Sequence, residues 1–246
     1  MVSTAKGIEL ITTETGRIKA YLRGTGPDQW GLDSPCEGWT VGDVIGHLGW
    51  AAEFFSDAIS QGRSGITSAP QGLPEIGTMP PAELPDFIAR MAKEYNRSAG
   101  SDLADAFASS VDRLGGIFSS MEDDDWSKEC FGLRMLQPAS AYVAIRISEV
   151  VIHYWDIRYP SNPKAPLSPE CVPAVLERLP VWLNSLGLAE FQPLQSPARY
   201  RVRTTGASDF QRDVVIGEGE NRVDSAQGNP TATFTCDADV LALLVW

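Results

Sequence analysis

The stretch ASAYVAIRISEVVIHYWDIR, residues 139–158, decides the fold because its polar side chains share one narrow helical face. At about 100° per residue, an arc of about 80° contains five of its side chains, and apolar side chains occupy nearly all of the remaining circumference. The five are Tyr142, Arg146, Glu149, His153 and Asp156. The arc can be read as the solvated side of an amphipathic helix, but an ordinary surface helix is polar over half of its circumference or more. We therefore predict a helix from about Pro138 to Tyr159 that is buried almost all round and turns a polar stripe toward a cavity.

Two residues of this stripe are suited to hold a metal ion. Glu149 and His153 are four residues apart, so their side chains lie on one helix face, roughly 5–6 Å apart at Cβ. The only other histidine of the chain, His47, lies in a predicted helix from Thr40 to about Ser60. It projects at the edge of the apolar stripe of that helix, so we expect it to face the interior of a helical bundle. A hydrogen-bonded core histidine is the alternative interpretation of His47.

Two imidazoles and a carboxylate form the ligand set of open catalytic metal sites, which leave positions for water and substrate. Cores of helical bundles commonly contain such sites. Neither the HExxH zinc signature nor the Glu-x-x-His spacing of di-iron bundles is present. We predict one divalent metal ion held by His47, Glu149 and His153. The residues alone leave the metal open, because Zn, Ni, Co and Fe all accept this ligand set.

The chain divides at a proline-rich stretch, SNPKAPLSPEC, residues 161–171. Before it, apolar periodicity predicts further helices, which cover residues 5–24, 81–98 and 102–121, and residues 62–81 form a loop rich in Gly, Ser and Pro. After it, we expect a helix over residues 169–186, strands over 199–205, 210–216 and 231–236, and a last helix from 237. The prediction is an α+β protein with a helical bundle over residues 1–160 and a small C-terminal α/β domain over residues 167–246.

The composition excludes several classes of function. The formal net charge is −12 and no segment concentrates Lys and Arg, so we expect no nucleic-acid partner. The apolar runs are too short to span a bilayer and the N-terminus lacks the pattern of a signal peptide, so we expect a cytoplasmic protein with no membrane partner. The four cysteines are widely separated, which favours free thiols over disulfides or a four-thiolate zinc site.

Two motifs of the chain resemble those of a known family. SPCEGWTVGDVIGHLGWAAEF (34–54) is similar to the C-x-GW-(S/T)-V-x-D-x-x-x-H opening of the mycothiol-dependent maleylpyruvate isomerase family, which is part of the DinB-like metal-binding bundles. SEVVIHYWDIR (148–158) is similar to the E-x-x-x-H-x-W-D motif of that family, and GNPTATFTCDADVLALLVW (228–246) resembles its smaller C-terminal domain. The resemblance implies a DinB-like four-helix bundle, and residue by residue it assigns the metal to His47, Glu149 and His153.

The resemblance also implies a zinc-like divalent ion and the thiol mycothiol as cosubstrate. A bound cation lowers the pKa of a thiol or a water and so supplies a nucleophile at neutral pH. In the isomerase, a thiolate adds to an activated double bond, the adduct rotates, and the thiol leaves; relatives would transfer the thiol onto an electrophile. In the family an Arg that follows the C-terminal helix is implicated in the isomerase activity, and the sequence ends at Trp246 before that position.

We also predict two catalytic residues, Arg146 and Asp156, and each has an alternative role. Asp156 is suited to orient His153 through a hydrogen bond, or to pair with Arg158 or Arg146. Arg146 is suited to bind a substrate carboxylate, or to pair with a carboxylate of the stripe. Tyr142 either lines the pocket or packs in the core. Three more residues of the motifs are interpreted as structural, namely Cys36, Trp39 and Trp155.

We therefore expect a metal-dependent isomerase or thiol S-transferase that uses mycothiol on a small electrophilic substrate. Two other functions stay open: a non-catalytic member of the bundle superfamily that binds a metal or a small molecule, and a metal-dependent hydrolase. The oligomeric state is not predicted.

Overall fold

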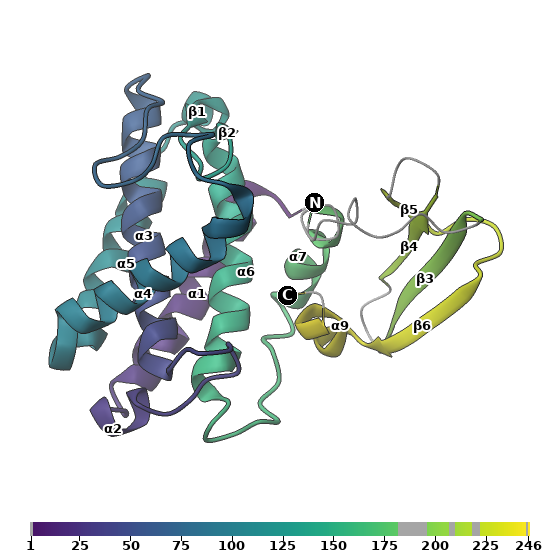
Figure 1. Cartoon of the computed structure of the whole chain (residues 1–246), viewed down its shortest axis with the longest axis horizontal. Coiled ribbons are helices and arrows are strands. Elements are labelled where there is room, and N and C mark those ends of the chain that lie inside the picture. The colour runs from purple at the N-terminus through teal and green to yellow at the C-terminus, as the bar shows by residue number, and fades with distance from the viewer. Residues whose placement is uncertain (1, 182–195, 207–209, 218–221, 245) are drawn as a thin grey trace. The chain divides into compact units, whose positions relative to one another are not determined.

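The computed structural model describes residues 2–181, 196–206, 210–217, 222–244 and 246. The chain divides into two compact units, Val2–Ala165 and Pro166–Trp246, and each is described by itself here. The division falls inside the proline-rich stretch 161–171. The first unit is built from helices, and the second contains a four-stranded sheet (Figure 1).

The first unit is a helical bundle, as predicted. Its long helices are α1 (Thr4–Leu22), α3 (Val41–Arg63), α4 (Leu84–Ala99), α5 (Leu103–Ser119) and α6 (Ala139–Arg158). Helix α3 is central, because it packs against α4, α5 and α6, while α1 packs against α6 and α5 (Figure 1). The predicted helices agree with the observed ones to within about three residues at each end.

Several short elements were not expected from the sequence. They are α2 (Pro27–Trp30), the 3₁₀ turn Gly100–Asp102, and the strands β1 (Glu129–Cys130) and β2 (Gln137–Pro138). A 3₁₀ turn, Pro81–Glu83, forms the start of the helix predicted over residues 81–98, and another, Asp123–Ser127, covers the acidic turn after α5. Strands β1 and β2 pair antiparallel and lead into α6. Elements of two to five residues are too short to show a helical or strand period, which explains why the sequence did not predict them.

Helix α3 begins at a capping box formed by Thr40 and Asp43. The Thr40 hydroxyl accepts a hydrogen bond from the Asp43 N–H at 3.2 Å, and the Asp43 carboxylate accepts one from the Thr40 N–H at 3.0 Å. Further along, α3 approaches α4 so closely that a Cβ atom at Gly46 would collide with the carbonyl oxygen of Ala92. This contact sets the rotation of α3, and His47, the next residue, is buried at 8 % exposure.

Helix α6 is buried almost all round, which confirms the sequence prediction. Between residues 142 and 157, Ala144 is the single residue classed as exposed. The polar side chains of the stripe are buried together with the apolar ones, and Arg146, His153 and Asp156 are at most 6 % exposed. Buried polar groups need partners inside the protein, so the stripe is the natural place for a site.

The second unit contains a sheet with the strand order β5-β4-β3-β6. Its strands are β3 (Ala198–Thr205), β4 (Gln211–Ile216), β5 (Arg222–Ser225) and β6 (Ala232–Asp237), and α9 (Ala238–Leu244) follows. Strand β3 pairs antiparallel with β4 and parallel with β6, and β4 pairs antiparallel with β5. Three of these strands and α9 were predicted, whereas the short β5 was missed.

The helix predicted over residues 169–186 is interrupted, so that prediction was wrong in its extent. The structure has α7 (Val172–Leu176), a turn at residues 177–178 and helix again at 179–181. Pro180 has no N–H to donate to the carbonyl of Leu176, so the regular hydrogen bonding of α7 cannot continue through it. Residues 182–186 lie outside the described part of the chain.

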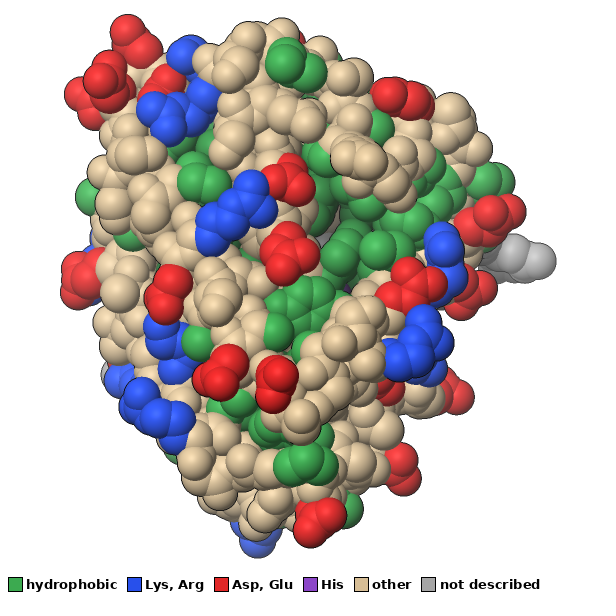
Figure 2. Space-filling model, turned by 90° about the vertical axis from the view of Figure 1, so that its left-hand side faces the viewer, with side chains coloured by type: hydrophobic (Ala, Val, Ile, Leu, Met, Phe, Trp, Pro, Cys, Tyr) green, Lys and Arg blue, Asp and Glu red, His purple; other side chains and the backbone are tan. Residues whose placement is uncertain are grey.

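The surface of the bundle is acidic, as the net charge requires. Figure 2 looks at the side on which α4 and α5 lie, and it shows hydrophobic side chains in a central hollow with Asp and Glu side chains around it. Among the described residues, none of the helices is both long and apolar enough to be a candidate membrane span.

Candidate metal centre

Three side chains from two helices converge in the first unit. His47 projects from α3, and Glu149 and His153 project from α6 one helical turn apart. Oε2 of Glu149 lies 2.6 Å from Nε2 of His47 and 3.4 Å from Nε2 of His153. The two imidazole rings meet edge to face, with 4.9 Å between their centroids. The structure therefore brings together the three residues that the sequence analysis selected.

Asp156 and Cys36 extend this cluster. Oδ2 of Asp156 lies 2.7 Å from Nδ1 of His153, and it accepts a hydrogen bond from the Cys36 thiol at 3.5 Å. Because Nδ1 of His153 donates to Asp156, the other ring nitrogen, Nε2, faces Glu149. Cys36 was interpreted as structural, and its contact with Asp156 places it beside the cluster. Cys36 lies four residues before the N-cap of α3, and nothing in the sequence around it predicts a contact with Asp156.

The electrostatics of the metal-free site differ between the two histidines. Burial lowers the pKa of His47, and its contact with Glu149 offsets this only in part. Burial also acts to lower the pKa of His153, but hydrogen bonds to Asp156, Cys36 and Glu149 outweigh it and raise that pKa well above 6.5. Burial alone would raise the pKa of Glu149, yet the two histidines hold it well below the usual value. A neutral His47 and a protonated His153 thus share the Glu149 carboxylate at neutral pH.

The donor set fits a divalent cation. One ligand atom from each of the three residues lies within 4.8 Å of the others, and all three residues are buried or nearly so. Two ligands about 2.1 Å from a tetrahedral ion are roughly 3.4 Å apart, which is the separation seen between Glu149 and His153. A bound ion would replace the direct hydrogen bond between His47 and Glu149.

Comparison with known proteins decides the family. The sequence profile of the mycothiol maleylpyruvate isomerase N-terminal domain matches residues 11–158, which include all three of these residues. The chain belongs to this family. No curated protein sequence gives a significant match.

Two solved structures of a mycothiol-dependent maleylpyruvate isomerase, one of them a histidine-to-alanine mutant, have the same fold as this family member. Their TM-scores are 0.66 and 0.67 at 16% sequence identity, and the match covers 99% of this chain and 89% of each of theirs. At this identity the likeness shows the fold alone.

A mostly apolar pocket of about 230 Å³ opens beside His47 and Glu149 in this maleylpyruvate isomerase family member. Aromatic and aliphatic side chains of α3 and α4 form much of its wall, with Trp50, Phe54 and Phe55 as the largest. Two polar residues also line it: Arg134, from the segment between β1 and β2, and Gln137, the first residue of β2. Sequence reasoning missed these two, because residues 131–137 show no helical or strand period that would assign them to a face.

The remaining residues of the stripe lie apart from this pocket. Nη1 of Arg146 donates a hydrogen bond to the Leu48 carbonyl at 3.0 Å, and its guanidinium lines a different cavity. The Tyr142 hydroxyl donates to the Phe131 carbonyl, and its ring packs edge to face on Phe55 at 4.9 Å. Tyr142 is thus a packed core residue, which was one of its two predicted roles. Trp39 packs edge to face against His47, with 5.5 Å between the ring centroids.

Proposed function

We propose that this protein is a mycothiol-using enzyme that binds one divalent metal ion through His47, Glu149 and His153. Zinc is the metal that we favour. We propose that it acts on a small electrophile, as an isomerase or a thiol S-transferase. Its membership of the maleylpyruvate isomerase family supports the use of mycothiol. The name of the two solved relatives, mycothiol-dependent maleylpyruvate isomerase, supports the isomerase as the first reaction to test.

The observation that carries the proposal is the convergence of the three residues beside an apolar pocket. His47 and Glu149 line the pocket and also take part in the convergent cluster. When bound there, a divalent cation lowers the pKa of a thiol and so supplies a thiolate at neutral pH. Apolar walls exclude water, which strengthens electrostatic interactions and limits competing hydrolysis.

The chain's own residues have distinct roles in this proposal. Asp156 holds the ring of His153 in one orientation, so that Nε2 faces Glu149. Trp39 and Trp50 flank the ring of His47, with centroid distances of 5.5 Å and 6.4 Å, and limit its rotation. Arg134 and Gln137 supply the polar groups suited to an oxygen-rich electrophile such as maleylpyruvate. Asp156 contacts His153 and would influence the substrate only through that ring. We therefore propose that it positions His153, whereas the sequence analysis predicted a catalytic role for it.

The proposal is tested with cobalt-substituted protein, because the visible spectrum of Co²⁺ reports its ligands. Saturating mycothiol is expected to change the spectrum, and the same protein is expected to isomerise maleylpyruvate only when mycothiol is present. Glu149→Gln removes a proposed ligand and should abolish both effects. Glu53→Gln, on the same helix as His47 but outside the metal pocket, is the matched control and should leave both unchanged.

The other functions give different results in this experiment. Consumption of mycothiol by an electrophile such as 1-chloro-2,4-dinitrobenzene, without isomerisation, would identify an S-transferase. Hydrolysis of an activated ester without thiol would support a metal-dependent hydrolase. A spectrum that mycothiol leaves unchanged at saturation would overturn the isomerase and the S-transferase alike.

A further inference from the structure

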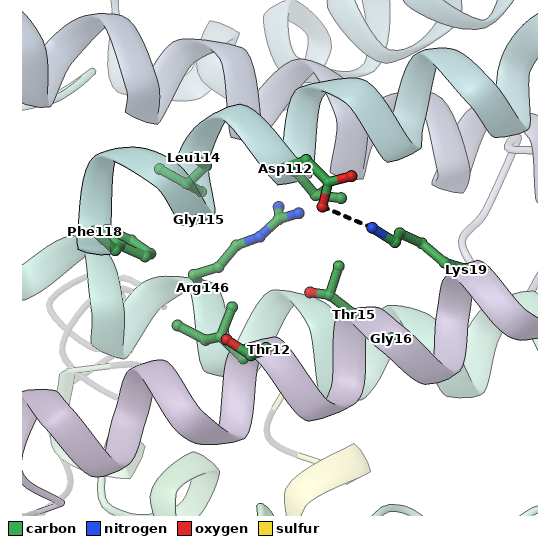
Figure 3. Close-up of a pocket in the computed structure, with 11 residues that line it drawn as sticks. Thr12, Thr15, Gly16, Lys19, Asp112, Leu114, Gly115, Phe118 and Arg146 are labelled. Carbon is green, nitrogen blue, oxygen red and sulfur yellow. Dashed lines mark hydrogen bonds and ion pairs between the residues drawn. The ribbon is translucent and has the colours of Figure 1, made fainter. Parts of the chain in front are cut away.

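A second cavity, of about 250 Å³, lies between α1, α5 and α6. None of the described residues that line it also lines the pocket beside His47 and Glu149. Its walls are largely apolar, formed by Ile11, Leu114 and Phe118 among others, and Arg146 enters it from α6 (Figure 3). This combination of apolar walls and one buried cation is unusual enough to require an explanation.

The guanidinium of Arg146 has unused capacity to donate hydrogen bonds. The residue is 1% exposed, and Nη1 donates to the Leu48 carbonyl at 3.0 Å. Its Nη2 is buried and has no hydrogen-bond partner within the described part of the chain. Burial lowers the pKa of Arg146 to about 10, which leaves it charged at neutral pH. A buried charge without a partner is costly, so a ligand that supplies an acceptor is favoured there.

A second unused donor lies in the same cavity. The hydroxyl of Thr15, on α1, is buried and has no hydrogen-bond partner among the described residues. Figure 3 shows Thr15 and the guanidinium of Arg146 on the same cavity. Thr12, one turn earlier, also lines the cavity, but its hydroxyl already donates to the Ile8 carbonyl at 2.8 Å.

The charges around the cavity favour a single negative charge. Lys19 and Asp112 pair at 2.6 Å and neutralise one another (Figure 3). They leave Arg146 as the one uncompensated charge among the described residues that line the cavity. Glu149 attracts Arg146 electrostatically, but its carboxylate is shared with His47 and His153.

We propose that this cavity is a binding site for a small monocarboxylate with a short apolar chain. The carboxylate accepts hydrogen bonds from Nη2 of Arg146 and from the Thr15 hydroxyl, and the chain packs against Ile11, Leu114 and Phe118. Liquid water occupies about 30 Å³ per molecule, so a cavity of 250 Å³ has room for an acid of about four carbons. The predominance of apolar wall distinguishes this ligand from phosphate or chloride, which would leave that wall hydrated.

The experiment titrates sodium butyrate into full-length, metal-loaded protein labelled at the isoleucine methyl groups, in a buffer free of carboxylates. Ile11 lines the proposed site and Ile88 lines the pocket beside His47 and Glu149, so their methyl signals report the two sites separately. Butyrate is expected to shift the Ile11 signal saturably and to leave Ile88 unchanged. Equal ionic strengths of sodium chloride, and equal concentrations of butanol, should produce no saturable shift at Ile11.

A matched pair of variants tests the donors. Thr15→Val should weaken butyrate binding about fivefold or more, because it removes one hydrogen bond to a charged group. Thr12→Val is the control and should change the affinity less than about twofold, since its hydroxyl is already satisfied. Arg146→Met keeps an unbranched side chain and should abolish the saturable shift. If Arg146→Met does not fold, the comparison of Thr15→Val with Thr12→Val still tests whether the carboxylate binds at this cavity.

Three results would overturn the proposal. The first is a butyrate response at Ile11 no larger than that of butanol or chloride. The second is an equal effect of Thr15→Val and Thr12→Val. The third is a saturable shift at Ile88 alone, which would place the carboxylate at the metal pocket. The proposal does not depend on thiol chemistry, so its failure leaves the proposed function untouched.

Discussion

Asp156 holds Nδ1 of His153 at 2.7 Å, and the opposite nitrogen of that ring faces Glu149 at 3.4 Å. The carboxylate fixes the rotation of the ring and, in the neutral imidazole that binds metal, the nitrogen that keeps the proton. It also accepts a hydrogen bond from the thiol of Cys36, so the chain segment before α3 is tied to the same point. A histidine positioned in this way would be preorganised for the metal ion that we propose.

The first prediction concerns Asp156→Asn. An amide cannot accept from Nδ1 with the strength of a carboxylate, so the affinity for zinc should fall about 10–100-fold. The fold should be retained, because Asn has nearly the same shape. Competition with a chelator of known affinity measures the change.

The control for this variant is Asp124→Asn, which lies in an exposed acidic turn and should leave zinc affinity unchanged. Equal zinc affinities of Asp156→Asn and the wild type would show that His153 is not held by Asp156 in the way described.

The second prediction concerns the pH dependence of metal binding. The pKa of metal-free His153 is raised well above 6.5, whereas that of His47 is lowered. At pH 7, His153 is therefore the positively charged imidazolium and His47 is the neutral imidazole. A metal ligand must be neutral imidazole, so binding at pH 7 should release about one proton. As the pH falls below the raised pKa of His153, the affinity should fall by about tenfold per pH unit.

Calorimetric titrations in buffers of different ionisation enthalpy measure the protons released. Affinity that is flat between pH 6 and 7, with no proton release, would contradict the described protonation of the cluster.

The convergence of His47, Glu149 and His153 was predictable from the sequence for simple geometric reasons. The spacing of Glu149 and His153 puts them one turn apart on any α-helix, and the chain has only one other histidine. The buried character of α6 could also be predicted, because the helix has so few polar positions.

Other features of the site could not be predicted, because they depend on packing between distant segments. Arg146 shares an arc with Glu149, yet its long side chain reaches the Leu48 carbonyl and a separate cavity. Arg134 and Gln137 line the pocket beside His47 and Glu149 from residues 131–137, where no periodicity assigns a side chain to a face. Cys36 contacts Asp156 across 120 residues of sequence, and nothing local indicates such a contact.

The third prediction concerns the close approach of α3 to α4 beside His47. In Gly46→Ala the new methyl group would meet the carbonyl oxygen of Ala92, so the helices must move apart. We expect a loss of about 1–3 kcal/mol in unfolding free energy and a lower zinc content, because His47 is the next residue.

Gly116→Ala is the matched control, since a Cβ atom there would meet nothing within 4 Å. It should stabilise α5 by about 0.5–1 kcal/mol. Urea denaturation compares the variants, and a Gly46→Ala protein as stable as Gly116→Ala would contradict the described packing.

The fourth prediction concerns the sheet of the second unit. The Asp213 carboxylate is fully buried and accepts hydrogen bonds from Arg199, Arg201 and the N–H of Gln227. These contacts hold the pKa of Asp213 well below the usual range, and the hydrogen bond from Arg201 has the largest effect. The carboxylate therefore stabilises the sheet at neutral pH, and this stabilisation is lost as the pH falls below about 4. Asp213→Asn should destabilise the sheet by about 3 kcal/mol.

Hydrogen exchange of the β3 and β4 amides measures this effect. Asp224→Asn removes a more exposed carboxylate that also faces Arg199, and it should cost less than about 1 kcal/mol. Equal exchange rates in the two variants would show that Asp213 does not hold these strands together.

The most direct test of the metal centre is elemental analysis of protein that has been reconstituted with zinc and dialysed. We predict about one equivalent of zinc in the wild type and almost none in His47→Ala or His153→Ala, with both variants still folded by circular dichroism. Wild-type protein that retains no metal after reconstitution, or a His153→Ala protein that keeps a full equivalent, would contradict the assignment of His47, Glu149 and His153.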